Sequence, residues 1–452
     1  MKNHMKQQTE HKPYVGDVGA PLETGAQKTS VGFGLVALAM LVGFIIGLVV
    51  WAVFWASSAL TELLWVDGRA SLSTLLASAG IPSWWLPIAF CTFGGLIIGL
   101  WSWKMGGDPE SLEAVMATVK QTGGYKLDKP AASIVGFLLP LVFGGSIGPE
   151  AGLTGIIAAA CTRIGNSLKA AGLRAKLLAD VTVSAALSAV FASPFAGIVA
   201  TAQDGMPALD PKDYEFRRRA KLVLYTASAL GAIIGIALFT AVFGKESGIP
   251  RFEGVTPGAN KLWWALPCIA AGYLAALLYH ASTAGFSVLD KRLGEHPVAK
   301  PVAAGLILGI LAVPLPYVLF PGEAQSFELM QSWASIGGAV LVVTGFAKCV
   351  ATPLCLSFGW RGGHFFPLIF AGIALGYGVA ALGGFEPMFC VAITTAVLIA
   401  GIQRKPLVAI ALLLLCFPAQ SIVWVGIACL IGATLPMPSK LAARTQRAGK
   451  EA

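Results

Sequence analysis

The chain has 452 residues, of which 56% are hydrophobic and only 12% are charged, and its formal net charge is +9. A soluble globular domain carries about 25% charged residues, so this composition excludes an ordinary soluble protein and favours a chain embedded in a lipid bilayer. The basic residues lie mostly between apolar runs and at the two termini, which fits the positive-inside rule and argues against a nucleic-acid partner.

The predicted elements begin with a polar segment over residues 1–29, which lacks the apolar stretch of a cleavable signal peptide. A membrane-spanning helix needs about 20 apolar residues. Two runs of this length follow, Val31–Val66 and Trp84–Trp103, the second with tryptophan at both ends. Further apolar stretches lie at about 131–143, 151–162, 177–202, 222–243, 261–283, 300–320, 336–357, 365–383, 387–401 and 406–435. Several are short and interrupted by glycine or proline, which is typical of helices that end inside the membrane.

A weak internal repeat divides the chain into two related halves. The pattern GGxxxP occurs at Gly144–Pro149 and again at Gly362–Pro367, and Ser193–Ile198 resembles Lys405–Ile410 at a similar offset. The predicted organisation is a polar cytoplasmic tail, a first membrane repeat, a loop, a second membrane repeat and a basic cytoplasmic tail. Their residues are 1–29, 30–245, 246–260, 261–438 and 439–452, respectively.

Three glycine-proline segments precede apolar helical stretches, at Met105–Glu110, Gly144–Glu150 and Gly362–Pro367. Proline is favoured in the first turn of a helix, and glycine lets the backbone turn sharply and approach a ligand. A helix N-terminus offers unpaired N–H groups and about half a positive charge. Several such helix ends directed at one point could bind an anion without a formally charged cation. For any one segment the alternative is an ordinary helix start with no role in binding.

These segments resemble the signature motifs of the CLC chloride channel and transporter family, in the order that the family has them. GGSIGPE resembles the GxEGP motif, GGHFFP resembles GGxFxP, and Gly106–Pro109 lies where the family has GSGIP. Phe191–Ile198 resembles the stretch between GxEGP and GGxFxP in the family. A literal GSGIP-like match at Ser247–Pro250 falls in a polar loop and is set aside.

The resemblance implies an all-α polytopic membrane protein of two inverted repeats, built from tilted and broken helices and assembled as a homodimer with one pathway per subunit. It also implies an anion pathway lined by backbone N–H groups. Carried over residue by residue, these lie near Gly106, Gly107, Ser146, Ile147, Gly148, His364 and Phe365.

The departures from the family pattern concern the side chains that gate or couple transport. The gating glutamate of the family aligns with Ile147, and the serine that touches the central anion aligns with Gly106. Asp108 replaces an apolar residue, and Asp204 aligns with the inner proton-handling glutamate. The family also has a tyrosine near its last helix, and this sequence shows no clear counterpart of it.

Glu150, Asp204 and Asp108 are the candidates for gating or proton coupling. Glu150 is either a displaced gate or a first-turn acid that neutralises the helix dipole, and Asp204 is either functional or a cytoplasmic helix-end residue. Lys348 lies in an apolar run, where it attracts anions, snorkels or pairs with an acid. His364 is either a pH-sensitive group or a residue of which only the backbone matters.

The function predicted from these residues is transport of chloride or a similar small inorganic anion, passive or loosely coupled to protons. The alternatives are a proton-coupled carrier of another anion such as fluoride, and a non-transporting membrane scaffold. The chain has no enzyme motif, and its eight cysteines form no CxxC pair, so no metal or cofactor is expected. The predicted location is the bacterial inner membrane, with both termini cytoplasmic and lipid as the surrounding partner.

Overall fold

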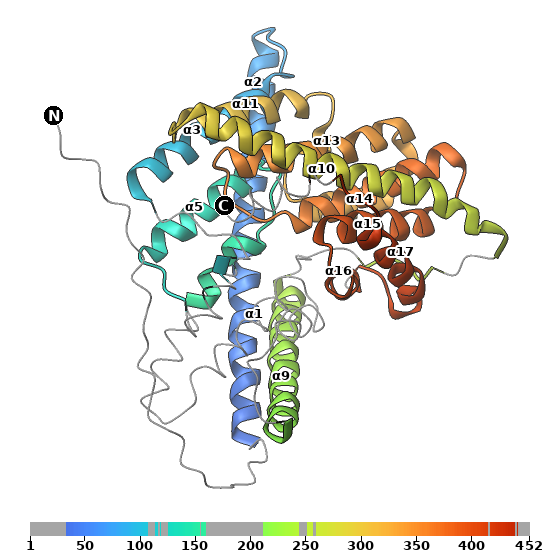
Figure 1. Cartoon of the computed structure of the whole chain (residues 1–452). Coiled ribbons are helices and arrows are strands. Elements are labelled where there is room, and N and C mark those ends of the chain that lie inside the picture. Colours follow the sequence, from blue (N-terminus) through green and yellow to red (C-terminus); the bar gives the residue numbers. More distant parts are fainter. Residues whose placement is uncertain are drawn as a thin grey trace.

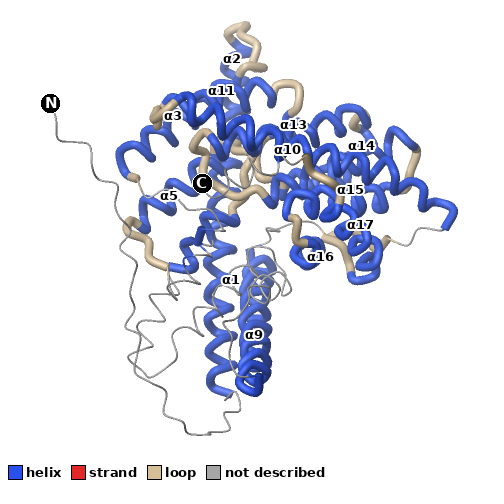
Figure 2. Tube along the Cα trace, in the orientation of Figure 1, coloured by secondary structure: helices blue, strands red, loops and turns tan. Residues whose placement is uncertain are grey.

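The computed structural model describes residues 33–106, 125–153, 155–159, 211–243, 251–255, 259–414 and 416–438, together with residues 114, 115, 118 and 441. Within these ranges the regular structure is helical, and the one strand-like pairing is an isolated antiparallel bridge (Figure 2). The elements are α1 (Phe33–Thr61), the π-helical η1 (Glu62–Gly68), α2 (Arg69–Ser78), α3 (Leu86–Met105), α5 (Pro130–Val142), α9 (Pro211–Phe243), η2 (Ala259–Trp264), α10 (Ala265–Leu293), α11 (Ala299–Ala312), η3 (Pro316–Val318), α12 (Glu323–Ser332), η4 (Trp333–Ser335), α13 (Gly338–Ser357), α14 (Phe365–Gly383), α15 (Pro387–Gln403), α16 (Pro406–Leu413), η5 (Ala419–Ser421) and α17 (Ile422–Thr434).

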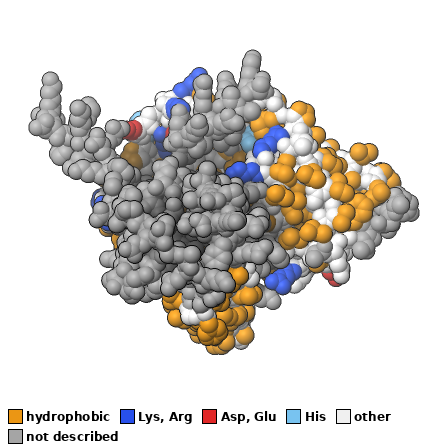
Figure 3. All heavy atoms as spheres, turned by 60° about the horizontal axis from the view of Figure 1, so that its bottom comes forward, with side chains coloured by type: hydrophobic (Ala, Val, Ile, Leu, Met, Phe, Trp, Pro, Cys, Tyr) orange, Lys and Arg blue, Asp and Glu red, His pale blue; other side chains and the backbone are white. Residues whose placement is uncertain are grey.

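Six helical stretches among the described residues are long and apolar enough to cross a bilayer. They are Val36–Ser78, Leu86–Met105, Val223–Phe243, Leu262–Leu293, Gly338–Ser357 and Phe365–Gly383. Many large hydrophobic side chains on them are exposed, and Figure 3 shows such side chains spread over the described surface with few charges between them. A surface of this kind suits lipid and not water, which agrees with the expected membrane protein.

The long helices α1 and α9 run side by side and extend away from the other helices (Figure 1). Small residues bring the two backbones together, because a Cβ added at Gly43 or Gly47 would overlap the backbone of Ser228 or Ala232. Near the end of the pair, the ring centroid of Trp51 lies 5.1 Å from that of Phe243. Close packing through glycine is the usual way in which helices associate where lipid removes the hydrophobic drive.

The helices α14 and α15 form the centre of the second half, surrounded by α10, α13 and α17 (Figure 1). Most residues of both helices are buried, which fits sequences that are apolar on all sides. The helix α15 begins at Pro387, and the Glu386 carboxylate caps it by accepting from the N–H groups of Met388 and Phe389 at 3.0 and 2.7 Å.

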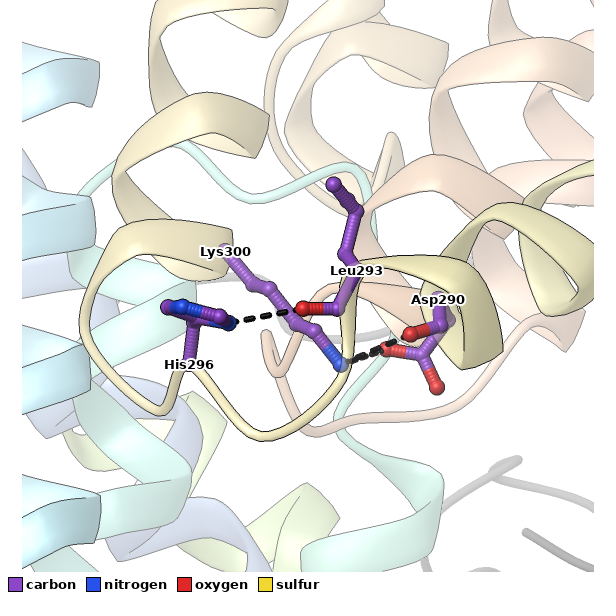
Figure 4. Close-up of polar contacts among 4 residues, drawn as sticks. All are labelled: Asp290, Leu293, His296 and Lys300. Atoms are coloured by element: carbon purple, nitrogen blue, oxygen red, sulfur yellow. Dashed lines mark hydrogen bonds and ion pairs between the residues drawn. The ribbon is translucent and has the colours of Figure 1, made fainter.

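The turn between α10 and α11 is fixed by polar contacts (Figure 4). Lys300 at the start of α11 binds Asp290 near the end of α10, with Nζ 2.5 Å from the carboxylate Oδ1 and 3.1 Å from the backbone oxygen. His296 Nδ1 donates to the carbonyl of Leu293 at 2.7 Å. Both contacts hold the turn in one conformation, so α11 is directed back against α3.

The predicted element bounds need correction at three places. The α-helix in the stretch 300–320 ends at Ala312, because Pro314 and Pro316 follow and proline supplies no N–H donor, and only the short 3-10 helix η3 comes after it. The stretch 406–435 is two helices, α16 and α17, and the chain between them is bonded to another segment, with the Phe252 N–H donating to Cys416 O at 2.6 Å. The first run continues helically past Val66 to Ser78. The predicted domain boundaries remain a prediction.

Candidate functional site

Two of the three glycine-proline segments lie against each other. The N–H of Gly148 donates to the carbonyl of Gly363 at 2.7 Å, and the N–H of Gly363 returns a hydrogen bond of 2.7 Å to Gly148. This pairing is antiparallel. It brings the start of the helical segment Glu150–Ala159 and the start of α14 to one point in the interior of the protein.

The third segment is described only in part. Gly106 ends α3 with a φ of 59°, which favours glycine, and its N–H donates to Ser102 O at 3.1 Å. Lys129 lies beside this corner and donates from Nζ to Met105 O at 2.6 Å. Gly107, Asp108 and Asp204 lie outside the described residues, so their proposed roles remain predictions.

Glu150 projects from the segment Gly144–Glu150, which we call the first motif, onto the N-terminus of α14. Its carboxylate Oε1 accepts a hydrogen bond of 2.6 Å from the backbone N–H of Phe365, and the side chain is fully buried. Backbone N–H groups at a helix start carry partial positive charge, and their hydrogen bonds to a carboxylate are short and strong. A negative group thus occupies the place where the sequence predicts an anion.

The two paired glycines leave room for this carboxylate. A Cβ added to Gly148 or to Gly363 would overlap the carboxyl group of Glu150. A third glycine, Gly362, makes room for Ile147, whose side chain a Cβ there would also overlap. The glycines of both motifs are therefore needed for close approach around Glu150 and Ile147, and not merely for turning the chain.

Replacing Gly363 by alanine is expected to lower the thermal stability of the purified protein and to displace Glu150 from α14. The new methyl group has no space beside the carboxylate, and overpacking a filled interior costs about 1–3 kcal/mol. Gly285→Ala is the matched control, since Gly285 lies in α10 with nothing near its Cβ position. Equal unfolding temperatures for the two variants would contradict the packing described above.

The other residues predicted in this motif have well-defined contacts. Ile147 is fully buried, so an apolar side chain stands where the family pattern has its gating glutamate. The hydroxyl of Ser146 lies 3.2 Å from the hydroxyl of Thr352 on α13, and both are buried. These contacts tie the first motif to α13 and leave Glu150 as the ionisable side chain that the first motif brings to α14.

His364 precedes α14 and is held by its neighbours. The side-chain amide of Gln403 donates to His364 Nε2 at 3.0 Å, and the imidazole ring stacks on Phe365 with centroids 4.6 Å apart. His364 is half-buried. Its ring therefore has a fixed place beside the start of α14, and both a backbone role and a role of the ring remain open as predictions.

Lys348 binds the backbone of a loop, and its predicted attraction of anions remains a prediction. It is fully buried in α13, and its Nζ donates to four consecutive carbonyls, those of Tyr317, Val318, Leu319 and Phe320, at 2.8–3.4 Å. It also lies 4.7 Å from the ring centroid of Phe370. Within the described part of the chain Lys348 forms no ion pair, so it binds backbone and neither snorkels nor pairs with an acid.

The segment that Lys348 holds contacts the first motif. The N–H of Phe320 donates to the carbonyl of Gly144 at 3.0 Å, and Phe320 has an unusual φ of 62°. Its ring packs edge-on against Trp65, whose Nε1 donates to Val142 O at 2.9 Å. This loop leads directly to Glu323, a half-buried acid whose Oε1 atom is shielded from solvent. Sequence reasoning missed it because it belongs to none of the three glycine-proline segments.

Comparison with known proteins agrees with this arrangement. The family model described as voltage gated chloride channel matches residues 90–436. The chloride/fluoride channel protein of Pseudomonas syringae pv. tomato is 23% identical over 312 residues, which are 66% of this chain and 64% of that protein. This chain thus spans just under two thirds of that relative. A protein of Escherichia coli O7:K1 with the provisional name ion-transport protein YfeO is 28% identical over 352 residues, 75% of this chain and 77% of that protein.

Solved structures show the same fold at low sequence identity. A slow cyanobacterial Cl⁻/H⁺ antiporter matches with a TM-score of 0.72 and 18% identity, over 93% of this chain and 100% of that one. A CLC-type fluoride/proton antiporter matches with a TM-score of 0.66 and 18% identity, over 90% and 97% of the two chains. The expected all-α polytopic fold is therefore confirmed, and its division into two inverted repeats remains a prediction.

Proposed function

Because the chain belongs to the voltage gated chloride channel family, whose members transport anions across membranes, we propose that it moves chloride or a similar small inorganic anion past the N-terminus of α14. We further propose that Glu150 closes this path in its ionised form. The observation that carries the proposal is the 2.6 Å hydrogen bond from the Phe365 N–H to the Glu150 carboxylate.

The physical argument is competition for one site. A helix N-terminus inside a membrane protein binds an anion through its N–H groups and its dipole. The Glu150 carboxylate already uses this binding capacity, so an anion gains it only after the carboxylate leaves or takes up a proton. Protonation removes the negative charge that would repel the anion, and anion flux should therefore rise as the pH falls.

The same geometry supports passive or loosely coupled flux more than strict proton exchange. Position 147 carries isoleucine, which binds no proton, and it is fully buried beside Gly362. Glu150 is then the one acid that the paired motifs bring to α14 among the described residues. In a protein with this arrangement the anion path would open in acid. The number of protons carried per anion would not be fixed.

The assembly and location are proposed on the family resemblance and on the charge pattern. We expect a homodimer in the bacterial inner membrane, with both termini in the cytoplasm, because basic residues are concentrated in the short loops and the tails. A mass measurement on the protein in lipid nanodiscs checks the dimer, and labelling of terminal cysteine tags in intact cells checks the orientation.

The test of the proposed function is ion flux from liposomes that contain only the purified protein. Chloride, fluoride and nitrate efflux are measured separately, with and without a pH gradient, and chloride efflux that accelerates in acid is expected. Fluoride efflux that requires a proton gradient would favour the proton-coupled carrier instead. Absence of any anion flux, from protein that is folded by size-exclusion chromatography, would leave only the membrane scaffold.

A further inference from the structure

A second acid, Glu323, comes close to the start of α14 from a third segment of the chain. It is the first residue of α12 and follows Gly322, whose φ is 104°. A Cβ added to Gly322 would overlap the ring of Phe370, which lies just over one turn beyond Phe365 on α14. The beginning of α12 is thus packed directly on α14 at Phe370.

The chain ahead of Glu323 is also tied to the first motif. Phe320 donates its N–H to Gly144, and a Cβ on Gly144 would lie 3.5 Å from the side chain of Leu319. Lys348 binds the carbonyls of this loop, so its position is set by α13 as well. Glu323 therefore follows a loop that is bonded to the first motif at Gly144 and to α13 through Lys348.

The two carboxyl groups influence each other. The Oε1 atom of Glu323 is shielded from solvent and has no hydrogen-bond partner among the described residues. Burial, and then the charge of the nearby Glu150 carboxylate, raise the pKa of Glu323 well above its usual value. Two carboxyl groups in such proximity resist being ionised together.

The other ionisable groups around the pair are engaged elsewhere. On α13, Lys348 binds four carbonyls. In the loop, Tyr317 donates its hydroxyl to Glu328 on α12 at 2.8 Å. Ahead of α14, His364 is bound by Gln403. With Lys348 and His364 bound in this way, protonation is the means by which one of the two acids loses its charge within the described part of the site.

We propose that Glu150 and Glu323 share one proton, and that Glu323 supplies this proton to Glu150 when the anion path opens. This inference rests on the proposed function, since it names the source of the proton for that gate. In the step, the proton leaves the carboxyl group of Glu323 and binds the carboxylate of Glu150. Glu323 becomes the carboxylate, Glu150 becomes neutral, and the Phe365 N–H is released to the anion. The charge of the pair is unchanged, so opening at neutral pH needs no proton from bulk water.

The test is chloride efflux from liposomes between about pH 4.5 and 8, a range that brackets the titration of shifted carboxyl groups. Glu323→Gln keeps the shape of a protonated glutamate but has no proton to give. We expect its flux near neutral pH to fall about tenfold, because the apparent pKa values of two coupled acids differ by about one pH unit or more. In acid its flux should equal that of the wild type. Glu323→Asp should retain the wild-type profile. Glu328→Gln is the matched control on the same helix and should also retain it.

A double variant separates this role from a purely structural one. Glu150→Gln has no gate to protonate, so adding Glu323→Gln to it should leave its flux unchanged. A Glu323→Gln profile equal to wild type, or a double variant that loses flux, would overturn the shared proton. Glu150→Gln with an unaltered pH response would instead overturn the proposed gate, so the two failures are distinguishable.

Discussion

Replacing Glu150 by glutamine is expected to raise chloride efflux at pH 7.5 by roughly 10- to 100-fold and to abolish its increase in acid. The ionised carboxylate holds the N–H of Phe365 in a buried 2.6 Å hydrogen bond. A hydrogen bond to a charged group contributes about 1.5–3 kcal/mol, and each 1.4 kcal/mol is a factor of ten in an equilibrium constant. Glutamine accepts the same bond without charge, so the anion competes with a weaker occupant.

The measurement is stopped-flow chloride efflux from liposomes at matched protein density over the same pH range. Glu295→Gln is the matched control, because Glu295 is an exposed acid in the turn between α10 and α11. If Glu150→Gln were as slow as wild type at pH 7.5, or kept its response to acid, Glu150 would be a helix-capping acid and no gate.

The helices of the second half could be predicted closely from the sequence. The apolar stretch 365–383 coincides with α14, and 387–401 lies within α15. Both helices begin with a proline-containing start signal and continue through apolar residues without interruption. The start signal and the apolar composition therefore predict the same helix. The prediction is poorer for the stretch 406–435. Its apolar composition is continuous, but the chain turns at Cys416–Pro418 between two helices.

The helix α12 was missed for a physical reason. Its residues, EAQSFELMQS, mix polar and apolar side chains and are too few to span a bilayer, so hydropathy gives no signal for it. It forms because Gly322 turns the chain onto α14 and the Ser326 hydroxyl bonds back to Gly322 O at 2.6 Å. These are tertiary contacts, which a local pattern does not contain.

The candidate site was predicted in part. The shared GGxxxP pattern indicated that Gly144–Pro149 and Gly362–Pro367 belong together, and the reciprocal hydrogen bonds between Gly148 and Gly363 confirm that they meet. The contact between Glu150 and Phe365 spans 215 residues and depends on glycine at both paired positions, so no spacing rule predicts it. Glu323 and the four carbonyls bound by Lys348 likewise depend on how a loop packs between helices.

Replacing Lys348 by methionine is expected to destabilise the fold by about 2–6 kcal/mol. Methionine has a similar length and fills the same space, but it cannot donate to the four carbonyls of residues 317–320. The contacts with Val318 O and Leu319 O are fully buried, and each buried acceptor left without a donor costs about 1–3 kcal/mol. The loop carries Glu323 and contacts Gly144, so the pH response of anion flux should change together with stability.

The measurement is the unfolding midpoint in a denaturing-detergent titration, with chloride efflux on the same preparation. Lys300→Met is the matched control, because Lys300 binds a half-exposed carboxylate at the turn between α10 and α11, where such a pair contributes about 1 kcal/mol or less. Lys348→Arg should resemble Lys348→Met, since a planar guanidinium directs its N–H groups in one plane and cannot converge on four successive carbonyls in a fully buried site. A stable Lys348→Met protein with unaltered flux would mean that the loop is held by its packing on Trp65 and Phe370 alone, and that the buried cation has another purpose.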